Sequence, residues 1–307
     1  MEGAAVVRGG AVLVDGAVTL DGVQLDVPSQ KLLVQGVSGT VPLSLDTTPG
    51  VPRRHREEGG FARGRYQQLL DELRNAAATG STLRIGTVHL GPLELGETTL
   101  ALRGGEGRVE IVSLRSSLHE GAILGRGFVA TRGGLAYGSD ILISDLSLRR
   151  FCDALPKIRG YVSGRLDGVV SLYGEGQGLD GLDGFVDLWA RESDAERMLL
   201  SKEFLQRLAG KKLRGFFFRD DRPFDRGEVS AYLEEGYLTF TVLDFSHTNL
   251  LGVKDLSVSV APVQNRIALD HLLGALKEAA ARGKSVQGEE EPPPEHPPPP
   301  ADFQWRD

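Results

Sequence analysis

The chain has 307 residues, 40 glycines and a formal net charge of −7. The acidic balance argues against a nucleic-acid surface, which needs clustered lysine and arginine. Glycine makes up about 13% of the chain, against a usual share of about 7%, and it follows no every-third-residue period, which excludes a collagen-like chain and favours frequent turns. The only cysteine, Cys152, cannot form an intramolecular disulfide or a cysteine-based zinc cluster. The fold must therefore depend on apolar burial and backbone pairing.

Residues 1–50 are expected to form a β-rich N-terminal segment. Short apolar runs, as in AVLVDGAVTLDGVQLDV, alternate there with Gly, Asp, Pro and Ser. The dipeptides Asp15-Gly16 and Asp21-Gly22 are typical of tight turns between antiparallel strands. The pattern predicts short strands joined by such turns.

Residues 51–80 are expected to form a loop followed by an amphipathic helix. Apolar residues recur at i, i+3, i+4, i+7 and i+11, namely Tyr66, Leu69, Leu70, Leu73 and Ala77. This spacing places them on one face of a helix from roughly residue 62 to residue 78. Gly80 is suited to end that helix.

Residues 81–282 are expected to form the main β domain. Apolar runs of about five to nine residues are separated by glycines or charged turns, which is typical of a meandering antiparallel sheet and not of βαβ units. The segment EVSAYLEEGYLTFTVLDF predicts a hairpin that turns at Glu234-Glu235-Gly236.

Helices and a tail complete the expected organisation. Ser193 and Glu196 have the spacing of a capping box before a helix that ends at Gly210. The apolar stripe of that helix consists of Leu200, Phe204, Leu205 and Leu208. Another short helix is expected near residues 267–282. Residues 283–307 combine an acidic run with polyproline and are expected to be disordered or to form an extended spacer.

Two strand segments far apart in the sequence are expected to share one apolar surface. Leu166, Val170 and Leu172 alternate with Arg165, Asp167 and Ser171, so one face of that strand is apolar and the other is polar. The same alternation places Leu238, Phe240 and Val242 on one face. The residues expected to line the apolar surface are therefore Leu166, Val170, Leu172, Leu238, Phe240 and Val242.

The sequence offers no motif for catalysis, a cofactor or a metal. The GEGQG run at 174–178 lacks the GxGxxG spacing and leads into a strand, so a β-turn is the better interpretation. The histidines form neither HExxH nor an i, i+4 pair, and no GxSxG surrounds a serine. Acidic pairs such as Asp220-Asp221 stand at expected turns, where both carboxylates stay solvated. We expect a protein that is not an enzyme and holds no cofactor or metal.

The order of strands and glycines suggests a family. The segments LRIGTVHLGPLELGETTLAL, RVEIVSLRSSLHEGAILGRGFVA, DILISDLSLRRFCDAL and GYVSGRLDGVVSLYGEGQGLDGLDGFVDL are followed by GEVSAYLEEGYLTFTVLDF and LSVSVAPVQNRIALDHLLGAL. Over roughly residues 80 to 278 this series resembles the C-terminal part of the AsmA-like and TamB-like superfamily. It is most similar to the YdbH-type intermembrane phospholipid transport proteins, also described as a dicarboxylate transport domain.

The resemblance implies a mainly β fold, an elongated and curved antiparallel sheet with two or three short helices that forms a taco-like groove. Its apolar concave face would shield phospholipid acyl chains. The implied function is non-enzymatic lipid binding and transfer, as part of a phospholipid bridge between the inner and outer membranes of a Gram-negative envelope. The implied location is the periplasm or cell envelope, associated with the inner membrane, with inner- or outer-membrane proteins as further partners.

Two other readings stay open at this point. A structural or adhesive β scaffold would have its apolar faces closed on each other and no ligand groove, so the free apolar area discriminates it from a lipid-binding groove. A β-helix enzyme that acts on polysaccharide would need clustered carboxylates and aromatic residues, and aromatic residues are only 7% of the chain. No run of about 18 apolar residues and no signal-peptide pattern is present. The sequence as read predicts a soluble, unsecreted chain or a piece of a longer protein with its anchor upstream.

Overall fold

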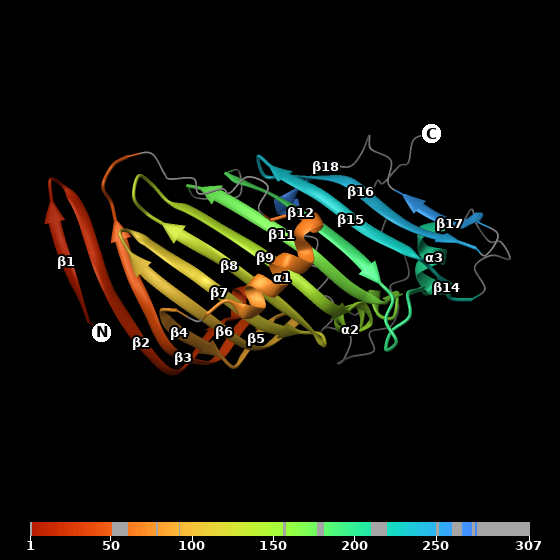
Figure 1. Cartoon of the computed structure of the whole chain (residues 1–307), viewed down its shortest axis with the longest axis horizontal. Coiled ribbons are helices and arrows are strands. Elements are labelled where there is room, and N and C mark those ends of the chain that lie inside the picture. Colours follow the sequence, from red (N-terminus) through yellow and green to blue (C-terminus); the bar gives the residue numbers. More distant parts are fainter. Residues whose placement is uncertain are drawn as a thin grey trace, which may run out of the picture.

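The chain is built on one large curved antiparallel sheet (Figure 1). The computed structural model describes residues 2–50, 61–77, 79–91, 93–155, 158–176, 181–209, 220–249, 252–259, 266–271 and 274. The 15-stranded sheet has the order β1-β2-β3-β4-β6-β7-β8-β9-β11-β12-β15-β16-β17, with β5 between β3 and β6 and β18 beside β16. Nearly every strand therefore pairs with its neighbour in sequence. The predicted fold class, a mainly β chain with an elongated curved antiparallel sheet and short helices, is confirmed.

The N-terminal half of the sheet consists of β1 Glu2–Arg8, β2 Ala11–Val27, β3 Leu32–Asp46, β4 Ser81–Ile85, β5 Thr87–Leu90, β6 Leu93–Gly105 and β7 Arg108–Leu118. The other half consists of β8 Gly121–Ala130, β9 Ala136–Ser147, β11 Arg165–Glu175, β12 Leu182–Arg191, β15 Arg226–Glu234, β16 Tyr237–Thr248, β17 Lys254–Ser259 and β18 Arg266–Ala268. A separate small sheet contains β10 Val162–Ser163, β13 Leu199–Leu200 and β14 Arg222–Pro223. The helices are α1 Tyr66–Asn75, α2 Leu148–Ala154 and α3 Lys202–Ala209, with the 3-10 turns η1 Pro28–Gln30 and η2 Arg63–Arg65.

Tight turns with positive φ connect several of the hairpins. Gly9 and Gly10 have φ values of 59° and 81° between β1 and β2, and Glu235 and Gly236 have φ values of 51° and 75° between β15 and β16. Two consecutive residues with positive φ are typical of the turn whose twist matches that of the flanking strands. The hairpin predicted at Glu234-Glu235-Gly236 is confirmed.

The turns predicted within the first fifty residues are wrong. Asp15-Gly16 and Asp21-Gly22 both lie inside β2, which is a single strand of 17 residues. Gly22 has a φ of 62° and stands where the register with β3 shifts. A glycine at such a bulge bends the strand without reversing it. The sheet then continues directly into β4, because Gly39 of β3 pairs with Leu83.

The predicted amphipathic helix packs on one face of the sheet as α1. Its apolar side chains Tyr66, Leu69, Leu70 and Leu73 are buried, together with Phe61, against Leu124, Leu142 and Val169 of β8, β9 and β11. The Tyr66 ring meets the Trp189 ring edge-on at 4.9 Å, and its hydroxyl donates a hydrogen bond to the Ile143 carbonyl at 2.9 Å. Burial raises the pKa of Tyr66 above its usual range. The observed helix is shorter than the predicted span, and Ala77 lies outside it.

Leu142 under α1 should be a strong determinant of stability. Its side chain is fully buried in the cluster below the helix. Leu142→Ala is expected to lower the free energy of unfolding by about 2–5 kcal/mol, because it leaves a cavity that the sheet cannot close. The neighbouring Ile141 points to the opposite face and is only half-buried, so Ile141→Ala is the matched control. Urea unfolding followed by circular dichroism gives both values, and an equal loss for the two variants would contradict this packing.

The second helix begins later than predicted. Ser193 Oγ does accept a hydrogen bond from the Glu196 backbone N–H at 3.1 Å, but this bond closes a turn. The chain then extends as β13, which pairs with β10 and β14, and α3 begins only at Lys202. Ser201 caps it, with its hydroxyl accepting from Phe204 N–H at 3.2 Å. Leu200, which was expected in the apolar stripe of the helix, therefore lies in a strand, because its pairing with β10 and β14 outweighs the local helical pattern. Gly210, the tail at 283–307 and most of the last predicted helix lie outside the described residues.

The small sheet and α3 cover one end of the large sheet. A buried cluster joins Met198, Leu200, Leu205 and Phe224 to Leu256 of β17, and Ala190 and Phe245 of β12 and β16 pack against it. The buried carboxylate of Glu196 ties this unit to the large sheet. It accepts hydrogen bonds from the backbone N–H groups of Arg149 and Gly164 at 3.0 Å each, and it lies 3.4 Å from Arg165 Nε. We call this unit, residues 193–209 with β10 and β14, the end cap.

Candidate functional site

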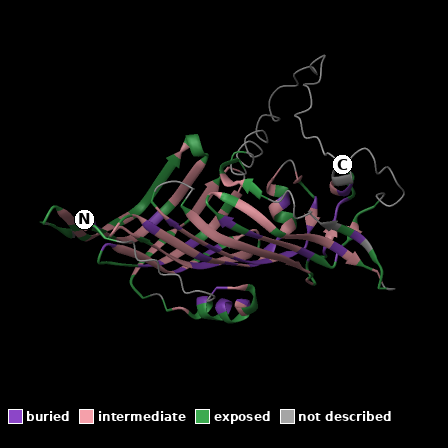
Figure 2. Ribbon diagram, turned by 90° about the horizontal axis from the view of Figure 1, so that it is seen from above, coloured by how far each residue is buried: buried purple, intermediate pink, exposed green. Residues whose placement is uncertain are grey.

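The two faces of the large sheet can be traced through its register. Residues directly opposite each other on paired antiparallel strands point to the same face. We define the outer face as the one that contacts α1 and includes Val169, and the inner face as the one that includes Val170. Figure 2 shows α1 beneath the sheet, whose ends bend away from the helix. The inner face therefore lies on the concave side.

An unbroken row of apolar or glycine residues crosses the inner face. In strand order from β2 to β16 it consists of Leu20, Gly39, Leu83, Leu100, Leu114, Gly125, Ile141, Val170, Val186, Ala231 and Phe240. The next row consists of Ser81, Leu102, Ile111, Gly127, Ser139, Leu172, Gly184, Leu233 and Leu238. Neither row contains a charged residue.

The outer face has a different character. The corresponding row there consists of Ser38, Arg84, Thr99, Arg115, Leu124, Leu142, Val169, Asp187, Ser230 and Val242. Its apolar residues in the middle are those that α1 covers. Between β3 and β7 and at Asp187 and Ser230 this row is polar, so the outer face is more polar than the inner face over most of the sheet.

Much of the inner face is open. Among the described elements, the end cap contacts this face at Ala190, Phe245 and Leu256, at one end of the strands. Farther along, Leu25 is 51% exposed, Leu90 is 48% exposed and Val129 is 46% exposed, and all three point inward by register. A large, continuous apolar surface that is exposed to solvent typically marks a site that binds a ligand, a membrane or another protein. The inner face is therefore the candidate functional site.

Glycines allow close backbone approach on the concave side. A Cβ atom at Gly125 would lie 2.8 Å from the Asp140 carbonyl oxygen, and one at Gly127 would lie 2.7 Å from the Gly138 carbonyl oxygen. Both distances are shorter than van der Waals contact, so a side chain at either position would push β8 and β9 apart. The close pairing of β8 with β9 at these two positions therefore requires glycine.

The structure places five of the six sequence-predicted residues on the inner face. Leu166, Val170 and Leu172 lie there on β11, and Leu238 and Phe240 lie there on β16.

The prediction for Val242 is wrong. Ser230 pairs with Val242 but Ala231 pairs with Phe240, so Thr241 is the extra residue of a β-bulge. A bulge inserts one residue and reverses the alternation of side chains beyond it. Val242 consequently lies on the outer face, in a cleft with Phe61 and Tyr232.

The inner-row residues of β2 to β9, β12 and β15 were missed by the sequence analysis. Their signal was present in alternating segments such as TLALR in β6 and ILIS in β9, and residues 1–50 were assigned to a separate segment. The pairing of β3 with β4 and β5 joins residues 1–50 to the rest of the face.

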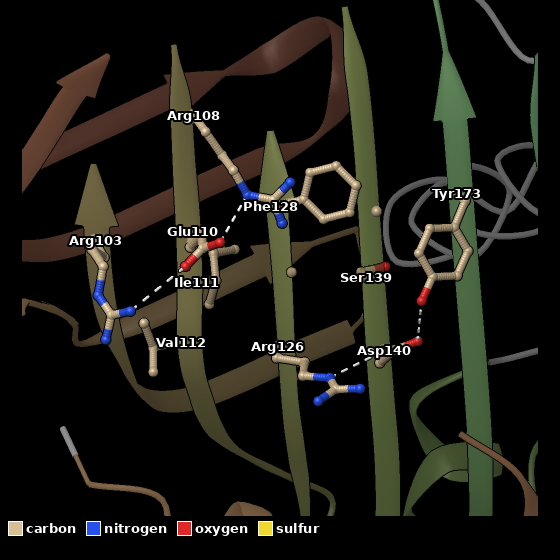
Figure 3. Close-up of a pocket in the computed structure, with 12 residues that line it drawn as sticks. Arg103, Arg108, Glu110, Ile111, Val112, Arg126, Phe128, Ser139, Asp140 and Tyr173 are labelled. Atoms are coloured by element: carbon tan, nitrogen blue, oxygen red, sulfur yellow. Dashed lines mark hydrogen bonds and ion pairs between the residues drawn. The ribbon is translucent and has the colours of Figure 1, made fainter. Parts of the chain in front are cut away.

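A cleft of about 410 Å³ lies on the outer face among charged side chains (Figure 3). Glu110 accepts a hydrogen bond from Arg108 Nε at 2.8 Å and lies 4.0 Å from Arg103. Asp140 accepts hydrogen bonds from Arg126 Nε at 3.1 Å and from the Tyr173 hydroxyl at 2.9 Å. Each carboxylate is thus bound within the protein. Arg103 and Arg126 reach carboxylates on the adjacent strands, whereas Arg108 binds Glu110 within β7. The Glu110 pairs are exposed to solvent, where such a pair contributes about 0.2–1 kcal/mol.

The described part of the chain gives little support for metal binding or for catalysis by a cysteine nucleophile. There, no group of three or more His, Cys, Asp or Glu side chains is placed to hold a metal ion. Cys152 is buried, and burial raises the pKa of its thiol. A thiol in that setting is a poor nucleophile.

Comparison with protein-family models, curated proteins and solved structures gave no match to this chain. Within the described residues, none of the helices has the length and apolar character needed to cross a membrane.

Proposed function

We propose that this chain is a non-enzymatic lipid-binding and transfer module whose inner face shields phospholipid acyl chains. The observation that carries the proposal is the apolar row from Leu20 to Phe240, which crosses the concave side of the sheet without a charged residue. Each methylene group moved from water onto such a surface contributes roughly 0.8 kcal/mol. Such a surface binds a lipid through the apolar area that the two bury together, and it needs no reactive side chain.

The dimensions of the sheet suit acyl chains. The path from β1 to β17 crosses twelve strand spacings, which at about 4.8 Å each gives roughly 58 Å. The hydrocarbon core of a bilayer is about 30 Å thick, so one leaflet contributes about half of that. The inner face is therefore long enough to hold more than one lipid along its axis.

The setting that we propose is the periplasm or cell envelope of a Gram-negative bacterium, in association with the inner membrane. There the chain would form part of a phospholipid bridge to the outer membrane, together with inner- or outer-membrane proteins. The support for this setting is the resemblance of residues 80 to 278 to the YdbH-type proteins.

A structural or adhesive β scaffold is the second candidate. It would need the apolar face to be sealed by other parts of the protein. The exposure of Leu25, Leu90 and Val129 favours the lipid-binding function over the scaffold.

Lipid analysis of the purified chain tests the proposal. Protein expressed in a Gram-negative host should retain phospholipid through gentle purification, and native mass spectrometry should show adducts with the masses of the lipids found by organic extraction. A chain purified under the same conditions without lipid, and unable to take up lipid from vesicles, would rule out the proposed function and favour the scaffold.

A further inference from the structure

The strand at the N-terminal end of the sheet has an open edge. Among the described residues, β1 pairs only with β2. The two-residue turn at Gly9-Gly10 makes Arg8 and Ala11 a hydrogen-bonded pair, and hydrogen-bonded and non-hydrogen-bonded pairs alternate along an antiparallel ladder. Ala4 and Val6 therefore bond to β2. Gly3, Ala5 and Val7 direct their backbone N–H and C=O groups away from the sheet.

Between its two charged ends, this edge has few of the features by which proteins prevent strand addition. The pairing of β1 with β2 is continuous from Glu2 to Arg8, without a bulge, and the strand contains neither proline nor lysine. Val7 is 73% exposed and Val6 is 53% exposed. A regular, apolar and unprotected edge is a ready site for pairing with another strand.

We propose that β1 pairs antiparallel with β1 of a second copy of this chain, in a register centred on Ala5. In that register Gly3 lies opposite Val7 of the second copy, and Ala5 lies opposite Ala5. All of these residues direct their backbone groups outward, so three pairs form with two hydrogen bonds each. The strand is thus complementary to itself in backbone hydrogen bonding.

The same register preserves the faces of the sheet. Gly3, Ala5 and Val7 pair with Gly16, Val14 and Val12 of β2 and lie on the inner face. A two-fold axis that passes midway between the two Ala5 residues, perpendicular to the sheet, leaves the inner faces of both copies on the same side. The dimer would then carry one continuous apolar face of about twice the length. That consequence rests on the proposed function, whereas the pairing itself does not.

Sedimentation velocity of the full chain over a range of concentrations tests the pairing. The parent should show a concentration-dependent dimer. Ala5→Pro removes an outward N–H without touching the bonds to β2, and it should raise the dissociation constant by at least about tenfold. Ala5→Val keeps the N–H and should still dimerise. A monomeric parent, or a dimer that Ala5→Pro leaves unchanged, overturns the proposal.

Cysteine cross-linking tests the register even if Ala5→Pro perturbs folding. Ala5→Cys should form a disulfide-linked dimer on oxidation, since the two Cα atoms would be about 5.5 Å apart. Val7→Cys is the control. Val7 is more exposed, but the two copies of it would be separated by four residues along the strands, or roughly 14 Å. Equal cross-linking of the two variants, or none by Ala5→Cys, overturns the proposed register.

Discussion

Val129→Asp should abolish most phospholipid binding and leave the chain folded. Val129 points to the inner face, and its side chain is 46% exposed, so water can reach a carboxylate there in the lipid-free protein. Bound acyl chains would remove that water. A charge without a partner against hydrocarbon costs several kcal/mol, so we expect binding to weaken by at least about tenfold. Cross-linking to a photoactivatable phospholipid measures binding, and circular dichroism measures folding.

The matched control for Val129→Asp is Tyr232→Asp. Tyr232 is 60% exposed and lies on the outer face, opposite Phe185 of β12. This variant introduces the same charge on a surface to which we assign no lipid contact, so it should bind phospholipid like the parent. Equal binding by the parent and by folded Val129→Asp would exclude this part of the inner face from the lipid site.

Glu196→Ala should destabilise the end cap severely. Glu196 is buried, and it is bound by two backbone N–H groups and by the buried guanidinium of Arg165. Its removal leaves Arg165 with an uncompensated charge on that side and leaves both N–H groups without their acceptor. Breaking a buried pair in this way typically costs about 3–5 kcal/mol, which we expect as the loss in free energy of unfolding measured in urea.

Glu120→Ala provides the comparison for Glu196→Ala. Glu120 also binds Arg165, at 3.1 Å, but its side chain is 47% exposed. Solvent screens such a pair, so the expected loss is about 1 kcal/mol or less. If both variants lose the same stability, burial of Glu196 is not the cause of its effect.

The local sequence pattern was sufficient to predict those helices and turns whose cause lies in the sequence nearby. The helical spacing of Tyr66, Leu69, Leu70 and Leu73 predicted the buried face of α1, because these side chains must all meet the same sheet surface. The hairpin at Glu235-Gly236 was predicted because its turn needs two residues with positive φ. In both cases the cause lies within a few neighbouring residues.

Register was harder to predict, because it depends on backbone features that leave no trace in the side-chain pattern. The segment TFTVLDF alternates regularly, yet the bulge at Thr241 places Val242 on the face opposite Phe240. Similarly, Asp21-Gly22 has the composition of a turn but forms a bulge within β2. The start of α3 depended on pairing of β13 with two short strands that are distant in sequence.

The most direct test of a lipid-binding inner face uses two positions on one strand. A photo-cross-linking amino acid is placed at Phe240, which lies on the inner face, and separately at Val242, which lies on the outer face only two residues away. Each protein is illuminated with vesicles of labelled phospholipid. We expect strong lipid cross-linking from position 240 and little from position 242. Equal labelling at both positions, or labelling only at 242, would contradict a lipid site on the inner face.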